Sequence, residues 1–417
     1  MKYASVLLAL GCLVTAVHPQ WLEHTINVDG CPSDLCYNYL NDKVYCTDLA
    51  NDLAVVIDCR TDSVVKKVPT GALPQSICYN RRDNRICTGN SMDNTVSVID
   101  GTSDSVVASV PTGAWPRALC YNFLNDNVYC ADYDDGTVTV IDGSTNSVLA
   151  TVQTGSNPIA LCWSERSNKV YCANLISRNV AVVGGIANQV IAYIETHDTP
   201  TKLFYNYPDD KVYCSDETRE AFVINCETDR HVASVQTAGV PCDFCLSTQG
   251  DKVYCACYPL IAVVDGARDK LLTSVTTDYS PYAMCYDSAH ERVYCANYNS
   301  DNVSVINCAA DSIVATIAVG SSPCALAYNP LRDRIYVANH NGSTVSVIRG
   351  SAPAVEEAPN ANMRATGTPT VLHSLPVGAV AFDAMGRRVV SPRSGIYFVT
   401  ENGARSTVHA RKVVIKR

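Results

Sequence analysis

Helical patterns, histidine and charge runs are scarce in this sequence. No segment shows an apolar period of 3.6 residues, eight histidines occur in 417 residues, and charged residues make up 18% of the chain. No Ser, His and Asp set stands out, and no glycine-rich phosphate loop precedes a helix. The CxxC at 242–245 is followed by leucine, whereas a c-type haem needs CxxCH. We therefore expect no enzymatic activity and no resident metal or cofactor.

Long apolar runs are missing beyond the first residues. Residues 6–17 form one such run, preceded by Lys2 and followed by the polar residues 18–20. This pattern is typical of a secretory signal peptide, which we place at residues 1–19. No other stretch approaches the roughly 20 apolar residues of a membrane helix. We expect the mature chain to be secreted or held at the outer cell surface, without a membrane span.

An excess of positive charge is missing from most of the chain. The formal net charge is −9, and acidic residues outnumber basic ones between residues 20 and 350. Nucleic-acid binding depends on neutralising phosphates with Lys and Arg. Residues 20–350 are therefore not expected to bind nucleic acid.

What the sequence does contain is a repeat of about 42 residues. The first copy carries short apolar, β-branched runs at 34–38, 43–47, 53–58 and 63–68, separated by Asn, Asp, Pro and Gly. Each run is too short for a helix, and four short antiparallel strands make one blade of a β-propeller. The copies open at Pro32, Pro74, Pro116, Pro158, Pro200, Pro241, Pro281 and Pro323.

The two ends of the array predict how the ring closes. The eighth copy supplies three strands before residue 351, and residues 24–30 match the pattern of the missing fourth strand. An N-terminal strand that completes the last blade removes the exposed sheet edges of an open array. We predict an all-β, eight-bladed β-propeller at residues 20–350, with seven blades as the alternative.

The second and third strands carry a family resemblance. VYCTD at 44–48, VYCAN at 170–174, IYVAN at 335–339 and VSVID at 96–100 resemble the YVTN-type β-propeller repeat. The resemblance implies a propeller that binds or displays, and it implies no reaction. We expect an exported binding or scaffold module for an unidentified protein or glycan. The alternatives are a lactonase-like or lyase-like propeller enzyme and a structural surface-layer component.

Cysteine is unusually common, with 21 residues. Pairing Asn38 with Val44 across the first hairpin would place Cys36 directly opposite Cys46, within reach of a disulfide. A register shift of one residue would turn the two side chains to opposite faces. Hairpin disulfides and free, buried thiols therefore both stay open. The candidate pairs are Cys36–Cys46, Cys78–Cys87, Cys120–Cys130, Cys162–Cys172, Cys245–Cys255 and Cys285–Cys295.

Repeated polar residues follow the second strand of most copies, and a propeller would arrange them as a ring. Asx side chains at a strand exit commonly cap the turn, and the alternative is a polar mouth for a ligand or a hard cation. Asp132, Asp134 and Asp135 could hold calcium, although they lack the EF-hand spacing. The ring consists of Asp48, Asp132, Asn174, Asp216, Asn297 and Asn339.

Copies four to six differ most from the repeat pattern. The chain after residue 350 no longer follows this pattern. We place a binding region at Trp163, Arg219 and Tyr258 in the divergent copies. Residues 351–370 are rich in Pro, Ala, Asn and Thr and predict a linker. Residues 371–417 contain three or more strands separated by Gly and Pro turns, which predict a small Ig-like β-sandwich.

Motifs of this tail resemble the C-terminal sorting domain of type IX secretion cargo. They are FDAMGRRV at 382–389, SGIYFV at 394–399 and RKVVIKR at 411–417. The resemblance implies recognition by the secretion machinery and export across the outer membrane. The residues that carry it are Gly386, Arg387, Gly395, Tyr397 and Lys412.

Overall fold

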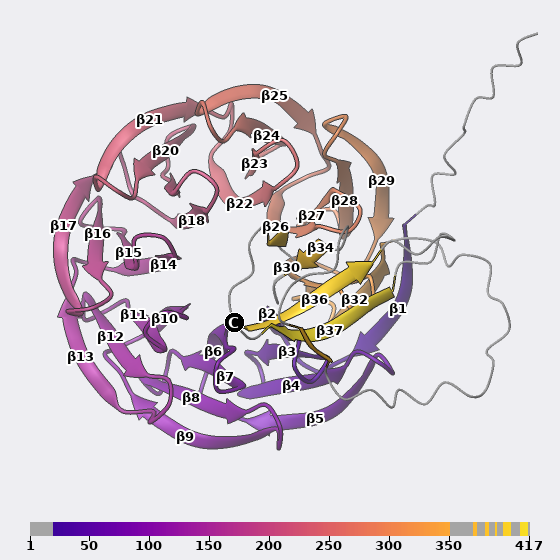
Figure 1. The fold of residues 1–417 in the computed structure, drawn as a ribbon, viewed down its shortest axis with the longest axis horizontal. Helices are drawn as coiled ribbons and strands as arrows, with labels where there is room; N and C mark the ends of the chain where they lie inside the picture. Colours follow the sequence, from indigo (N-terminus) through magenta and orange to yellow (C-terminus); the bar gives the residue numbers. More distant parts are fainter. Residues whose placement is uncertain are drawn as a thin grey trace, which may run out of the picture.

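The computed structural model describes residues 20–350 and, in the tail, the strand segments 370–372, 380–382, 388–389, 395–401 and 409–415. Residues 20–350 form eight four-stranded antiparallel sheets arranged in a ring (Figure 1). The eight-bladed prediction is thereby confirmed over its seven-bladed alternative. Within the described part of the chain, no helical segment has the length and hydropathy to cross a lipid bilayer.

Each blade runs from the ring axis outward. The first consists of β2 (Pro32–Asn38), β3 (Lys43–Asp48), β4 (Leu53–Asp58) and β5 (Ser63–Pro69). The second blade consists of β6 (Pro74–Asn80), β7 (Arg85–Asn90), β8 (Thr95–Asp100) and β9 (Ser105–Pro111), and the third of β10 (Pro116–Asn122), β11 (Asn127–Asp132), β12 (Thr137–Asp142) and β13 (Val148–Gln153). The fourth consists of β14 (Pro158–Ser164), β15 (Lys169–Asn174), β16 (Asn179–Gly184) and β17 (Gln189–Glu195), and the fifth of β18 (Lys202–Asn206), β19 (Lys211–Ser215), β20 (Glu220–Asn225) and β21 (Arg230–Gln236). The sixth consists of β22 (Pro241–Ser247), β23 (Lys252–Cys257), β24 (Leu260–Asp265) and β25 (Lys270–Thr276), and the seventh of β26 (Pro281–Asp287), β27 (Arg292–Asn297), β28 (Asn302–Asn307) and β29 (Ser312–Ala318).

Burial explains why the middle strands have apolar side chains on both faces. In β3 and β4, every residue after the first is buried, because each blade packs face to face against its neighbours. In the outermost strand β5 only Val68 is buried, and the other residues are exposed or half-buried. The hairpin turns are closed by Asx residues at positive φ, such as Asp42 at 55° and Asn84 at 55°.

The N-terminal strand closes the ring. The eighth blade contains β30 (Pro323–Asn329), β31 (Arg334–Asn339) and β32 (Thr344–Arg349), and β1 (Trp21–Asn27) is its fourth strand. β1 lies at the periphery, antiparallel to β32, as predicted (Figure 1). Glu23 in β1 pairs with Arg334 at 2.7 Å and with Arg349 at 2.9 Å. The two ends of the propeller are thus joined by a strand ladder and by ion pairs.

The strand register corrects most of the predicted disulfides. Asn38 pairs with Lys43 rather than Val44, because Asp42 at positive φ closes a turn one residue shorter than assumed. Cys36 therefore lies opposite Tyr45, and Leu35 lies opposite Cys46, so the two sulfurs point to opposite faces. The same correction applies to Cys120–Cys130, Cys162–Cys172, Cys245–Cys255 and Cys285–Cys295.

The second blade differs from the others. Cys78 lies directly opposite Cys87, because Cys87 occupies the second-strand position that tyrosine fills in the first blade. This hairpin has the same turn length as that of the first blade. All described cysteines are free thiols in the structure, including these two.

The described tail strands form one five-stranded sheet in the order β33-β37-β36-β34-β35. Their bounds are β33 (Thr370–Leu372), β34 (Val380–Phe382), β35 (Arg388–Val389), β36 (Gly395–Glu401) and β37 (His409–Ile415). Gly395 and Tyr397 lie in β36, and Lys412 lies in β37. Gly386, Arg387, the signal peptide and residues 351–369 of the linker fall outside the described residues.

Candidate ligand site in the central channel

The innermost strands surround a channel that opens into a cavity of about 730 Å³ at the end where these strands begin. All eight blades contribute residues that follow the opening proline, beginning with Ser33 and Asp34 in β2. The repeat therefore converts one sequence position into a wall around the axis. Whatever side chains occupy that position determine the chemistry of the channel.

Three blades place a charge where the others have a small residue. The second residue after the proline is Asp34, Lys202 or Asp243 in the first, fifth and sixth blades. In the other blades it is Ser76, Ala118, Ala160, Ala283 and Ala325. Because small residues suffice to build the wall, the three charges are not required by the fold.

Lys202, which lines the cavity, forms an ion pair with the buried Asp243. Nζ of Lys202 lies 3.1 Å from Oδ1 of Asp243, and the other carboxylate oxygen accepts a 2.8 Å hydrogen bond from the backbone N–H of Met284. The charge of Asp243 raises the pKa of Lys202 above its usual value. The Lys202 side chain is 48% exposed, so its ammonium group faces the open channel.

Asp34 extends from the opposite side of the ring. Its carboxylate accepts hydrogen bonds from the backbone N–H groups of Leu35 at 2.9 Å and Ile77 at 3.2 Å. Burial raises the pKa of Asp34 to about 6, against the opposing effect of these bonds and of Lys202. The charges of Asp34 and Lys202, which belong to opposite blades, therefore interact across the channel.

Arg117 is the cation of the channel that lacks an acidic partner among the described residues. It is exposed, and its guanidinium donates a hydrogen bond to Oε1 of Gln75 in the neighbouring blade. It also borders a second hollow of about 390 Å³, together with Trp115, Tyr133, Asp134 and Ile159. An unpaired guanidinium thus lies between the channel and a groove with two aromatic walls.

Trp115 occupies a demanding backbone position. Its φ is 59°, in the left-handed region, and its N–H donates a 3.0 Å hydrogen bond to Oδ1 of Asn94. The equivalent residue of the fourth blade is Asn157, with φ of 57°, and asparagine tolerates this conformation better than tryptophan does. Leu73 has the same position in the second blade with φ of 56°, but Trp115 is the one that borders the hollow beside Arg117.

Further aromatic side chains surround the same opening. Tyr282 and Tyr298 both line the cavity, with ring centroids 5.3 Å apart. Tyr258 and Tyr279 lie in loops beyond them, 5.1 Å apart and exposed. Polar and aromatic groups therefore share one face of the propeller.

The side chains of the predicted polar ring are hydrogen-bonded to strand and turn residues. Asp48 accepts a 2.8 Å bond from the N–H of Cys31, and Asp132 accepts bonds from Thr137 and Thr139 at 2.9 and 2.7 Å. Asp216 accepts a bond from the N–H of Thr218, and the side-chain amides of Asn174, Asn297 and Asn339 donate to nearby strand or turn residues. All six are fully buried and lie outside the cavity lining. These side chains cap the turns and do not form a mouth.

Other predicted sites are dispersed. Asp135 accepts the N–H of Ala114 at 2.7 Å, while Asp132 is bonded inside its own blade, so the proposed calcium carboxylates do not converge. Trp163 packs against the core between the third and fourth blades. Tyr258 does lie on the channel face.

Sequence reasoning missed Arg117, Trp115, Asp34 and Lys202, although one signal for the three charged residues existed. Comparing the two residues after each opening proline, copy by copy, would have revealed charges among Ala and Ser. The strand ends show a further member of the buried polar ring, because Asn90 ends β7 as Asp48 ends β3. Asn90 bonds to Thr95 at 3.0 Å and to Ser97 at 2.9 Å.

Comparison with solved structures shows the fold. A chain of Kuenenia stuttgartiensis hydrazine synthase matches with a TM-score of 0.55 and 15% identity, covering 76% of this chain and 95% of that one. The computationally designed Ika8 protein gives 0.65 and 17%, covering 79% and 99%. The dihydro-heme d1 dehydrogenase NirN in complex with DHE gives 0.62 and 13%, covering 76% and 75%. No protein-family model and no curated protein matches the chain.

Proposed function

We propose that this chain is an exported binding module whose channel face recognises a carboxylate-bearing glycan. The observation that carries the proposal is the unpaired guanidinium of Arg117 beside the groove of Trp115 and Tyr133. Guanidinium binds carboxylates through two parallel hydrogen bonds. Sugar rings present apolar C–H faces, which pack on aromatic side chains while their hydroxyls bond to polar groups nearby.

The charges inside the channel support a polar ligand. Lys202 and Asp243 offer a donor and acceptors, and Asp34 lies opposite them. Partly buried charges are costly unless they are paired, and three of them at a position where alanine or serine suffices favour recognition over a purely structural role. This argument also favours a binding module over a surface-layer component.

A propeller enzyme is the second candidate, and its strongest residues are Cys31 and His340. The Cys31 sulfur lies 3.4 Å from Nδ1 and 3.3 Å from Nε2 of the imidazole, so it aligns with neither nitrogen. Burial and the charge of Asp48 raise the pKa of the Cys31 thiol, whereas a nucleophilic cysteine needs a lowered one. The pair therefore supports no nucleophilic role, and binding is the better proposal.

Export is part of the proposal. The apolar N-terminal run supports secretion, and the motifs around Gly395, Tyr397 and Lys412 support a sorting tail read by the secretion machinery. If deletion of residues 371–417 leaves the chain reaching the medium or the cell surface, the sorting role is wrong.

Calorimetric titration of the full mature chain tests the binding proposal. An oligogalacturonide should bind, and a neutral oligosaccharide of the same length should not. Arg117→Gln should weaken binding by about 10–100-fold, since a charge-assisted hydrogen bond is lost. Arg82→Gln removes an equal charge from the opposite end of the second blade and should leave binding unchanged. Binding of polyglutamate instead would identify an acidic protein as the ligand, and binding of neither would overturn the proposal.

A further inference from the structure

At the end of the propeller opposite the cavity, neighbouring blades are joined by a repeated hydrogen bond. The last residue of an innermost strand donates from its side-chain amide to an Asx residue in the next blade's first turn. The bonds are Asn38 to Asn84 at 2.8 Å, Asn122 to Asn168 at 2.8 Å and Asn329 to Asp42 at 2.9 Å. Each of these junctions pairs a donor with an acceptor.

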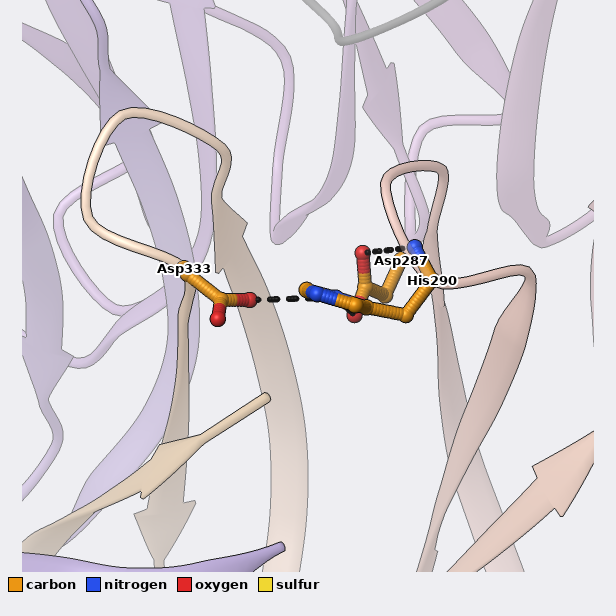
Figure 2. Close-up of side chains that lie close together, drawn as sticks. All are labelled: Asp287, His290 and Asp333. Carbon is orange, nitrogen blue, oxygen red and sulfur yellow. Dashed lines mark hydrogen bonds and ion pairs between the residues drawn. The ribbon is translucent and has the colours of Figure 1, made fainter. Parts of the chain in front are cut away.

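The junction between the seventh and eighth blades breaks this rule. Asp287 ends β26 and is fully buried, and the residue it faces across the junction is Asp333. His290 extends between the two carboxylates, with Nδ1 2.8 Å from Oδ2 of Asp287 and 3.2 Å from Oδ1 of Asp333 (Figure 2). The two carboxylates of Asp287 and Asp333 thus occupy the positions that an amide donor and an acceptor occupy at the three junctions above.

The three ligand atoms have the spacing of a metal site. They all lie within 4.8 Å of one another. A tetrahedral zinc ion with bonds of about 2.0–2.1 Å holds its ligand atoms roughly 3.3 Å apart, close to the two distances from His290. Asp287 is anchored in the interior, while the side chains of His290 and Asp333 are 28% and 25% exposed. An ion can therefore enter from solvent onto a fixed ligand.

The surroundings of the cluster contain a second observation. Tyr294 is fully buried, and its hydroxyl has no hydrogen-bond partner among the described residues. Burial and the nearby charge of Asp287 raise the pKa of Tyr294, which places the hydroxyl in the field of the cluster. Gly350 encloses the other side, because a Cβ there would lie 2.3 Å from Oδ1 of Asp333 and 3.1 Å from Oδ2 of Asp287.

We propose that Asp287, His290 and Asp333 form a three-ligand Zn²⁺ site that joins the seventh blade to the eighth, beside the seam where the ring closes. The donor set of one imidazole and two carboxylates suits zinc, with water as the fourth ligand. The two carboxylates give the site a negative charge that favours a cation.

Zinc titration of the chelator-treated mature chain tests the site. The wild type should bind one Zn²⁺ here and melt at a higher temperature when it is bound. Asp287→Asn restores the amide found at other junctions, so the variant should fold, and it should weaken this site by at least about 10–100-fold. His290→Gln should do the same through a different ligand. Glu291→Gln neutralises a carboxylate on the same turn that bonds to Tyr286, and it should leave affinity unchanged.

Cobalt substitution separates this site from the free cysteines, which also bind zinc. Bound Co²⁺ should show the visible spectrum of nitrogen and oxygen ligands and no thiolate charge-transfer band, and Asp287→Asn should abolish it. A thiolate band, equal zinc affinity in the wild type and Asp287→Asn, or no zinc binding by the wild type would overturn the proposal.

Discussion

Tyr171 donates a 2.7 Å hydrogen bond to Asp229, which belongs to the neighbouring blade. Lys169 pairs with the same carboxylate at 2.7 Å. Equivalent bonds run from Tyr213 to Asp269, Tyr254 to Asp311 and Tyr336 to Asp62. The second-strand tyrosine of the repeat is thus a core residue that also joins two blades by a hydrogen bond, and we call this tyrosine–aspartate bond the latch.

The seam lacks this latch. In the other blades the acceptor lies in the turn after the third strand, and among the described residues of the eighth blade none accepts a hydrogen bond from Tyr294. Arg292 donates instead to the carbonyl of Gly350 at 2.9 Å. Among the described residues, this junction therefore has an arginine–carbonyl bond in place of the tyrosine–carboxylate bond.

Phenylalanine substitution should measure the latch. Tyr171→Phe should lower the free energy of unfolding by about 1–2 kcal/mol, because a buried bond to a carboxylate is lost. Tyr294→Phe should change it little, since no bond is removed. Denaturant unfolding in the presence of a chelator compares the two, and an equal loss in both variants would contradict the latch.

Thiol counting should confirm the corrected register. The six predicted disulfides would leave eight reactive thiols after denaturation, whereas five of those pairs face opposite sides of their hairpins. Nearly all twenty described cysteines should therefore react in the denatured, unreduced chain. Cys78 and Cys87 are the pair that an oxidant could join, and their loss alone would leave eighteen. A count near eight would contradict the register.

The period of the repeat predicted the blades, their number and the closing strand, because hydrophobic alternation and turn residues act locally. The register depended on Asp42 adopting positive φ, which decides between two turn lengths that the sequence permits equally. The channel charges were harder to predict. Asp34 and Lys202 lie four repeats apart, and only ring closure brings their charges together.

Stability should depend on pH through Asp34. Its pKa in the folded chain is raised to about 6 from an ordinary 3.8. The free energy of unfolding therefore decreases as the pH rises through this window, because ionisation of Asp34 is less favourable in the folded chain than in the unfolded one. Asp34→Asn should therefore raise the melting temperature at pH 8, and the gain should vanish below about pH 4, where both states are protonated. Lys202 and Asp243 face the same group, so Lys202→Met should raise the apparent pKa further. A gain independent of pH would contradict the assignment.

Trp115 should show opposite effects on stability and binding. Trp115→Asn places at φ of 59° a residue that the equivalent position of the fourth blade already uses, so backbone strain falls and the melting temperature should not decrease. The same change removes an aromatic wall of the groove beside Arg117, and the affinity for oligogalacturonide should fall at least about tenfold. Leu73→Asn, at the same position of the second blade with φ of 56°, is the matched control and should leave affinity unchanged. If Trp115→Asn destabilises the chain and preserves affinity, the tryptophan is a packing residue and the glycan groove lies elsewhere.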